Sequence, residues 1–236
     1  MNDSVSEALD SLRAGRFVLI YDADGREEET DMVVASQFVT PVAIERLRRD
    51  AGGLICTTVD HESHEKLGTP YLSDLFYKEG GRYPLLKELI PNDIPYDTKS
   101  SFSITINHRR TFTGITDKDR ALTISGFARL LDAVREADGP SAQRLFGESF
   151  RAPGHVHLLN CDNHLLSKRF GHTELSTALV VMAGLTPSAT ICEMMGGPEG
   201  TARRKSDAVK YAKEYGIVHL EGRQIIEAWR QWQGSE

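Results

Sequence analysis

Apolar residues along this chain recur in two patterns, one typical of helices and one typical of strands. Those at positions 5, 8, 9 and 12 keep helical spacing until Gly15, and the apolar run at 17–21 that follows predicts a strand. Further strands are predicted at 32–35, 54–59, 101–107, 190–195 and 217–220. Helical segments alternate with them. The pattern therefore predicts one α+β domain over residues 1–236, a layered α/β sandwich in which a mixed, twisted β-sheet is flanked by helices.

Residues with capping chemistry mark where these helices are expected to begin. The candidate caps are Ser4, Thr40, Asp60, Thr116 or Asp117, Thr173 and Ser206. Two strand regions carry more specific expectations. In 101–107 the apolar Phe102, Ile104 and Ile106 alternate with polar residues, which predicts one buried face. Residues 150–159 are predicted to be a loop that enters a strand.

The periodic pattern is lost between residues 69 and 99. Four prolines, at positions 70, 84, 91 and 95, break any long helix or strand there. The segment still contains many apolar residues, so we expect a loop-rich excursion with short turns rather than disorder. Segments of this length often cover a site or contact a partner subunit, and we expect one of these roles here.

Composition narrows the classes of protein that fit. The 236 residues, 40% of them hydrophobic, are enough to bury one sizeable core, and the formal net charge of -6 argues against a nucleic-acid-binding surface. Neither a signal peptide nor a run of roughly 18 to 20 apolar residues is present, so we expect a soluble, cytoplasmic protein. Cys56, Cys161 and Cys192 are too scattered for a disulfide framework or a zinc cluster, so we expect reduced, buried thiols.

The most unusual stretch is 22–31, where six carboxylates lie between two apolar runs. Carboxylates this close repel one another unless a cation or hydrogen-bond donors compensate their charge. Magnesium suits such a turn because it takes one or two carboxylates and leaves positions for water and substrate oxygens. The alternative is a solvated acidic loop, which the apolar flanks disfavour. An EF-hand is disfavoured as well, because the glycine comes too early and a strand precedes the turn.

A second informative stretch is 167–174, where a glycine-containing turn leads into a helix. Arg169 and the free amides of the helix start would form an anion site that fits a phosphate. His172 lies in the same turn, where it either ligates a metal or bonds to the backbone. Glu193, in the predicted strand at 190–195, is either an acid or base at a strand end or part of a structural salt bridge. No nucleotide-binding or serine-hydrolase motif is present, so we expect no nucleotide cofactor.

Five separated motifs together resemble those of the 3,4-dihydroxy-2-butanone 4-phosphate synthase family in its archaeal, single-domain form. They are residues 24–32, 113–116, 151–155, 169–174 and 191–194, and the resemblance covers nearly the whole chain. It implies a lyase that converts ribulose 5-phosphate to dihydroxybutanone phosphate and formate in riboflavin biosynthesis, through a magnesium-stabilised enediolate. It also implies Mg²⁺, with Mn²⁺ as a substitute, and a homodimer.

The resemblance assigns roles residue by residue. Glu27 and His172 match the family's metal ligands. Its catalytic positions match Asp31, His155 and Glu193. The implied substrate-binding set is Arg26, Glu27, Asp31, Cys56, Thr113, Arg169, His172, Thr173 and Glu193.

One position departs from the family pattern. Glu28 stands where the family commonly has Asn or Gly, so its carboxylate either changes how many ions bind or points to water. Two other functions remain open on the sequence. One is a magnesium-dependent sugar-phosphate isomerase or aldolase, which would release no formate from ribulose 5-phosphate. The other is a module that binds a phosphorylated ligand or nucleic acid without turnover.

Overall fold

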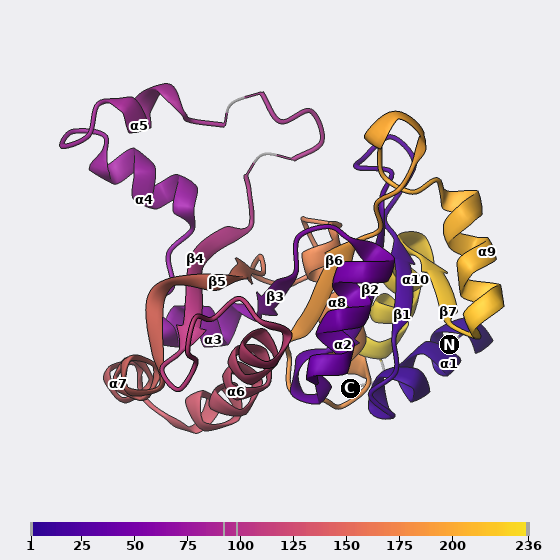
Figure 1. The fold of residues 1–236 in the computed structure, drawn as a ribbon, viewed down its shortest axis with the longest axis horizontal. Helices are drawn as coiled ribbons and strands as arrows, with labels where there is room; N and C mark the ends of the chain where they lie inside the picture. Colours follow the sequence, from indigo (N-terminus) through magenta and orange to yellow (C-terminus); the bar gives the residue numbers. More distant parts are fainter. Residues whose placement is uncertain (1, 92, 98, 235–236) are drawn as a thin grey trace.

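A seven-stranded mixed β-sheet runs through the centre of this computed structural model, which describes residues 2–91, 93–97 and 99–234 (Figure 1). The order of the strands is β4-β5-β3-β6-β2-β1-β7. Their bounds are β1 Val18–Tyr21, β2 Thr30–Ala35, β3 Cys56–Val59, β4 Phe102–His108, β5 Phe150–Asn160, β6 Ala189–Glu193 and β7 Val218–Glu221. β1 pairs with β7 and β3 with β5 in parallel, whereas the other neighbouring strands are antiparallel. The predicted mixed sheet is confirmed.

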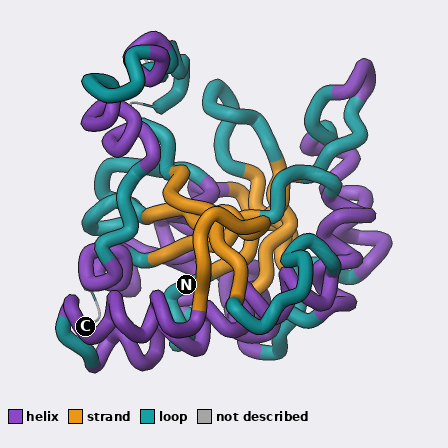
Figure 2. Tube along the Cα trace, turned by 60° about the vertical axis from the view of Figure 1, so that its left-hand side comes forward, coloured by secondary structure: helices purple, strands orange, loops and turns teal. Residues whose placement is uncertain are grey.

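Helices cover both faces of the sheet (Figure 2). One layer consists of α1 (Asp3–Arg13), α8 (His172–Met182) and α10 (Gly222–Gln233); the other contains α2 (Pro41–Arg46), α3 (His61–Leu67), α6 (Asp117–Glu136), α7 (Gly139–Ser149) and α9 (Lys205–Tyr215). A hydrophobic core lies between the sheet and each helix layer. Within β1, Val18 and Ile20 pack against the layer of α1, α8 and α10, and Leu19 packs against the other layer, because side chains alternate across a strand. Burial on both faces explains why the central strands are continuous apolar runs. The layered α+β class is therefore confirmed.

The pairing of β2, β3 and β6 brings three candidate site residues to one edge of the sheet. Asp31 near the start of β2 lies opposite Glu193 at the end of β6. Cys56 at the start of β3 lies opposite Ile191 of the same strand. Because antiparallel neighbours run in opposite directions, the beginnings of β2 and β3 meet the end of β6. The acidic turn before β2 therefore opens onto this edge.

The segment from 69 to 99 extends away from the sheet, at the upper left of Figure 1. It contains the short helices α4 (Leu72–Glu79) and α5 (Leu85–Glu88), neither of which has a buried residue. The segment therefore contains two short helices in addition to the expected loops and turns, and its prolines keep either helix from extending further. Asn92 and Thr98 lie outside the described residues. Near its end, Ile94, Tyr96 and Asp97 line a cavity at the sheet edge.

Capping chemistry predicts some helix starts correctly. Thr40, Asp60 and Thr116 each accept a hydrogen bond from the amide three residues later, at 3.1 to 3.2 Å. The other three predicted caps are wrong, because the N-caps of α1, α8 and α9 are Asn2, Gly171 and Arg204. At α8 the sheet-packing face extends to the first residue of the helix, so Thr173 is buried inside the first turn rather than at the cap.

The two specific strand expectations are corrected in part, since Ile104 and Ile106 pack on the core as expected but Phe102 does not. In β4, Phe102 is exposed and Ser103 is buried, because a register irregularity between Phe102 and Thr105 turns the side chains over. The Ser103 hydroxyl donates to the carbonyl of Pro70 at 2.6 Å, which satisfies it in the interior. The predicted loop at the start of 150–159 belongs instead to β5, in which Phe150 and Arg151 pair with β4 and a register irregularity separates them from the next paired residue, Val156. None of the helices among the described residues is long and apolar enough to span a bilayer.

Candidate active site

The acidic turn is ordered by its own first carboxylate. Asp22 is buried and accepts hydrogen bonds from the backbone amides of Glu27 and Glu29 at 3.0 and 3.1 Å. Its Oδ2 atom also accepts from Arg26 Nη1 at 3.1 Å. Glu28 is exposed and adopts a left-handed conformation with φ of 58°, and its carboxylate accepts from the amide of Gly25 at 2.8 Å. The additional carboxylate of this chain therefore bonds its own turn.

Glu27 and His172 meet across the cavity although they are 145 residues apart. The Nδ1 atom of His172 lies 3.1 Å from Glu27 Oε2, and its Nε2 atom lies 3.8 Å from Asp31 Oδ1. Ligating atoms of Asp22, Glu27 and His172 all lie within 4.8 Å of one another. We call Asp22, Glu27, Asp31 and His172 the carboxylate end of the cavity.

Two buried polar atoms of the carboxylate end suit a bound cation or substrate oxygen. Among the described residues, neither His172 Nε2 nor Asp31 Oδ1 has a hydrogen-bond partner, and their separation is too long for a bond between them. Buried polar atoms are normally satisfied, so these two atoms are available to a bound cation or a substrate oxygen. Carboxylate oxygens and an imidazole together match the ligands that magnesium and manganese accept. The residues present therefore fit the metal that the sequence predicts.

The electrostatics of the carboxylate end favour an added positive charge. Burial raises the pKa of Asp31 well above its usual range, and the nearby Glu193 and Glu27 raise it further against the opposing charge of His172. Burial alone would lower the pKa of His172, but Asp31 and the hydrogen bond to Glu27 raise it above its usual value. Neighbouring carboxylates contribute to both shifts, beside burial in the case of Asp31, and a divalent cation would offset their negative charge.

Two arginines converge beside the carboxylate end, around the start of α8, and Arg26 Nη1 also pairs with Glu27 Oε2 at 2.9 Å. Arg169 donates through Nη1 to Glu174 Oε2 at 2.5 Å and through Nε to Asp97 Oδ2 at 2.6 Å. Arg26 Nη2 donates to the same Asp97 oxygen at 3.3 Å. A Cβ at Gly171 would lie 2.6 Å from Arg26 and 2.9 Å from Arg169, so a larger residue would displace both guanidinium groups. We call Arg26, Arg169 and Asp97 the arginine end.

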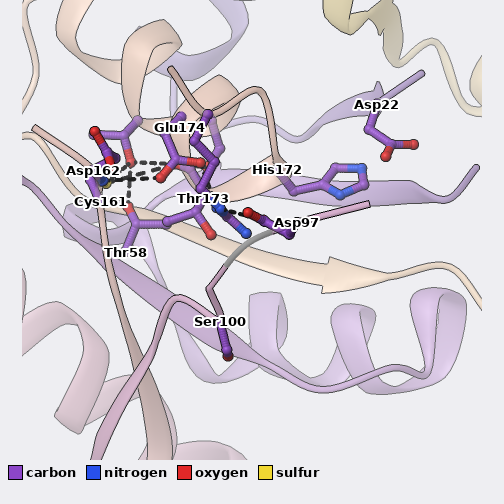
Figure 3. Close-up of polar contacts among 12 residues, drawn as sticks. Asp22, Thr58, Asp97, Ser100, Cys161, Asp162, His172, Thr173 and Glu174 are labelled. Carbon is purple, nitrogen blue, oxygen red and sulfur yellow. Dashed lines mark hydrogen bonds and ion pairs between the residues drawn. The ribbon is translucent and has the colours of Figure 1, made fainter. Parts of the chain in front are cut away.

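The helix start adds its own donors to the arginine end. Among the described residues no side chain caps α8 at Gly171, so the amides of His172 and Thr173 are available to a ligand. Thr173 lies in this first turn and lines the cavity with Arg169 and His172. Figure 3 shows Thr173, His172 and Asp97 together at this position. Guanidinium groups and a helix N-terminus are the donors that proteins use for phosphate.

The remaining cavity residues are held by the sheet. The cavity, of about 150 Å³, is lined by Glu27, Asp31, Cys56, Arg169, His172, Thr173 and Glu193, among others. Glu193 Oε2 accepts from the amide of Leu54 at 2.7 Å, so its carboxylate is anchored by backbone rather than by the structural salt bridge that the sequence left open. Burial, with the charges of Glu193 and Asp31, raises the pKa of the Cys56 thiol, which makes Cys56 a neutral wall and not a nucleophile.

Two predicted site residues, Thr113 and His155, do not line this cavity. Both are exposed and both contact Asn107, whose side chain donates to the Thr113 carbonyl at 3.4 Å and lies 3.1 Å from His155 Nδ1. They belong to the β4 and β5 side of the sheet, next to the exposed Phe112 and Ile115. Their roles stay predictions.

Sequence reasoning missed three charged residues of the site. Asp22 was one of six carboxylates with nothing to single it out, although its position directly after the strand, before a turn, is a usual one for a side chain that caps backbone amides. Glu174 was seen only as part of a motif, whereas its fully buried side chain is the partner of Arg169. Asp97 lies in the segment 91–97, which resembles the archaeal form of the family, but nothing in the sequence points to its partners, which lie 71 and 72 residues away.

Comparison with known proteins places this site in a family. A family model described as 3,4-dihydroxy-2-butanone 4-phosphate synthase matches residues 6–228. The synthase of that name from Methanothermobacter thermautotrophicus is 50% identical over 97% of this chain and 96% of its own length, and that from Methanosarcina mazei is 43% identical over 100% and 94%.

Solved structures agree with the relatives. The Candida albicans synthase has a TM-score of 0.71 at 28% identity, over 95% of this chain and 96% of that one. A synthase described as in complex with two magnesium ions has a TM-score of 0.73 over 99% of each chain, and at 22% identity it shows the shared fold. The chain belongs to the 3,4-dihydroxy-2-butanone 4-phosphate synthase family of enzymes.

Proposed function

We propose that this enzyme converts D-ribulose 5-phosphate to L-3,4-dihydroxy-2-butanone 4-phosphate and formate, an early step towards riboflavin. The observation that carries the proposal is the meeting of the carboxylate end and the arginine end in one cavity. The first suits the oxygens of the reacting carbons and the second suits the phosphate. The five carbons of the substrate are divided between a four-carbon phosphate and formate, and the reaction requires no oxidant or reductant.

Glu27 and His172 are proposed to hold Mg²⁺ or Mn²⁺, with Asp22 adjacent. When bound, the ion supplies positive charge to substrate oxygens that become negative during the reaction, including those of the enediolate. A protein of the same fold is described in complex with two magnesium ions, which supports magnesium as the ion. Arg26, which donates to both Asp22 and Glu27, keeps these carboxylates in place.

Asp31 and Glu193 are proposed to transfer protons. The buried Asp31 carboxyl has a raised pKa, and a general base or acid works best when its pKa lies near the operating pH. Glu193 lies opposite Asp31 across the β2 and β6 pair, with one carboxylate oxygen fixed by the Leu54 amide. The two carboxyl groups therefore reach the same substrate from neighbouring strands.

The arginine end is proposed to bind the phosphate, through Arg26, Arg169, Thr173 and the first amides of α8. This assignment sets the orientation of the bound substrate, with its phosphate at α8 and its carbonyl towards Glu27 and Asp31. Cys56 is proposed to line the pocket between them. The buried, free thiols of the three cysteines support the expected cytoplasmic location.

The test is release of formate. Purified protein is incubated with uniformly ¹³C-labelled ribulose 5-phosphate and Mg²⁺, and ¹³C NMR follows the products, with a chelator as the control. The proposal predicts formate and a four-carbon phosphate in equal amounts, and none with the chelator. A five-carbon product would indicate an isomerase, and two larger fragments would indicate an aldolase. Either outcome, or no reaction, would contradict the proposal.

A homodimer is proposed as the functional unit, with Thr113 and His155 acting at the cavity of a second copy. Their exposure beside Phe112, which is 93% exposed, and Ile115 supports this arrangement. Mixing inactive Glu27→Gln and His155→Asn proteins tests it. If each site uses residues of both copies, reassorted dimers contain one intact site and recover about a quarter of the wild-type activity. No recovery after confirmed subunit exchange would contradict shared sites.

A further inference from the structure

Asp97 occupies the arginine end from a distant part of the chain. Its Oδ2 atom accepts hydrogen bonds from Arg169 Nε at 2.6 Å and from Arg26 Nη2 at 3.3 Å. The side chains of all three residues are largely buried, with exposed fractions of 12 to 18%. Tyr96, the neighbouring residue, lies with its ring 5.3 Å from the Arg26 guanidinium. One carboxylate thus bridges the two cations, and Figure 3 shows Asp97 close to Thr173 in the first turn of α8.

Both arginines are already positioned by other, more deeply buried carboxylates. Arg169 Nη1 donates to Glu174, whose side chain is fully buried in the first turn of α8. Arg26 Nη1 donates to Asp22, whose side chain is also fully buried. These anchors belong to elements that pack on the sheet. Asp97 belongs to the excursion, whose helices have no buried residue. The guanidinium groups therefore keep their places without Asp97.

Asp97 meets Arg169 at the wall of the cavity, and Arg26 lies directly behind them on the same Asp97 oxygen. Asp97, Arg169 and Thr173 line the same cavity, and α8 opens its uncapped start towards them. Burial disfavours the charge of Arg169, and Glu174 followed by Asp97 restores it, raising the pKa of Arg169 above its usual value. An arriving anion must therefore replace Asp97 at the two arginines in order to bind there.

We propose that Asp97 is a specificity-determining residue, an internal carboxylate that ligands must displace from Arg26 and Arg169. A phosphate monoester carries up to two negative charges and three terminal oxygens, so it can replace the carboxylate on both arginines. A singly charged carboxylate ligand offers no more than Asp97 itself, which is already tethered at the site. The site therefore selects phosphorylated ligands over other anions. The identity of the phosphorylated ligand rests on the proposed function.

The size of the effect follows from competition. If Asp97 occupies the arginines about nine-tenths of the time, the apparent affinity for any anion is reduced about tenfold. Removing the carboxylate abolishes this reduction. Asp97→Asn keeps the size of the side chain and a hydrogen-bond acceptor but loses the charge. Asp93→Asn is the matched control, because it removes an exposed carboxylate four residues away in the same segment.

Isothermal titration calorimetry of the full chain with inorganic phosphate, and separately with acetate, tests the inference. Asp97→Asn is expected to bind phosphate about tenfold more tightly than wild type, and to bind acetate measurably. Asp93→Asn is expected to stay within about twofold of wild type for both anions, since an exposed charge is screened. Asp97→Ser replaces the variant if circular dichroism shows that Asp97→Asn is unfolded.

Weaker or unchanged phosphate binding by Asp97→Asn would overturn the inference, because it would make Asp97 an orienting partner of the arginines. An equal gain in phosphate affinity in Asp93→Asn would overturn it too, since loss of any negative charge in the segment would then strengthen anion binding. These binding measurements need no turnover. If wild type releases no formate and Asp97→Asn still tightens phosphate binding, the proposed function fails and the inference about Asp97 stands.

Discussion

The two ends of the cavity hold their charges in different ways. At the carboxylate end, Asp22 and Asp31 are buried, and backbone amides, a paired strand and α8 fix the side chains. At the arginine end, the cations are held by the core, but the anion that faces them, Asp97, comes from the excursion. The comparison suggests that one end is built to keep its partner ion, whereas the other is built to exchange an internal anion for a ligand.

The largest expected effect is at the carboxylate end. Glu27→Gln removes a proposed metal ligand and the charge that pairs with His172. We expect turnover of ribulose 5-phosphate at saturating Mg²⁺ to fall at least about 100-fold, because the metal's contribution to the transition state is several kcal/mol. Glu28→Gln is the control and should keep activity within about twofold, since Glu28 is exposed and bonds its own turn. Equal losses in both variants would contradict the assignment.

At the arginine end the informative substitution is Arg169→Lys. Arg169→Ala would leave the fully buried Glu174 without its cation, at a cost of about 3 to 5 kcal/mol, so it would test folding instead of binding. Lysine keeps the charge but loses the paired donors. We expect the Michaelis constant to rise about tenfold with a smaller change in turnover number, measured by formate release. An unchanged Michaelis constant would remove Arg169 from the phosphate site.

A smaller effect is expected from Gly171→Ala, which adds a Cβ between the two arginines. Its φ of -83° is open to alanine, so the fold should remain while both guanidinium groups shift. We expect calorimetry to show phosphate binding about threefold to tenfold weaker, because the displaced guanidinium groups no longer align their hydrogen bonds with the phosphate oxygens. Gly147→Ala in α7, where a Cβ meets nothing within 4 Å, is the control and should bind phosphate as wild type does. Equal phosphate binding by both variants would show that Gly171 is not part of the anion site.

The smallest effect concerns stability of the acidic turn. Glu28 adopts a left-handed φ of 58°, which Asn and Gly adopt more easily. Glu28→Asn should raise the free energy of unfolding by about 0.5 to 1 kcal/mol, whereas Glu28→Ala should not raise it. Chemical denaturation measures both variants. A stability gain in Glu28→Ala would show that charge relief, not backbone strain, limits the turn.

Local chemistry explains what the sequence predicts well. The caps Thr40, Asp60 and Thr116 need only a side chain and an amide three residues later, so they can be read from short segments. The buried strands are visible because both faces require apolar side chains. Thr173 was predicted wrongly as a cap because packing of α8 on the sheet, a long-range effect, moved the helix start to Gly171.

Long-range geometry explains what the sequence misses. The resemblance to the family and the acidic turn both point to Glu27 and His172, and the structure brings these two residues together. No pattern in the sequence links Asp97 to Arg26 and Arg169, because the excursion lacks periodicity and its return to the cavity depends on tertiary packing. The same limit applies to Phe102, whose side chain is exposed through a register irregularity of β4.

The most direct test is an anomalous difference map from crystals of the protein grown with Mn²⁺. The account predicts a peak within coordination distance, about 2.0 to 2.3 Å, of both a Glu27 carboxylate oxygen and a His172 ring nitrogen. His61, His64 and Glu65 form a second group of metal-ligating side chains among the described residues, so manganese has another place to bind. A peak only at that second group, or a cation bound by neither Glu27 nor His172, would contradict the central claim.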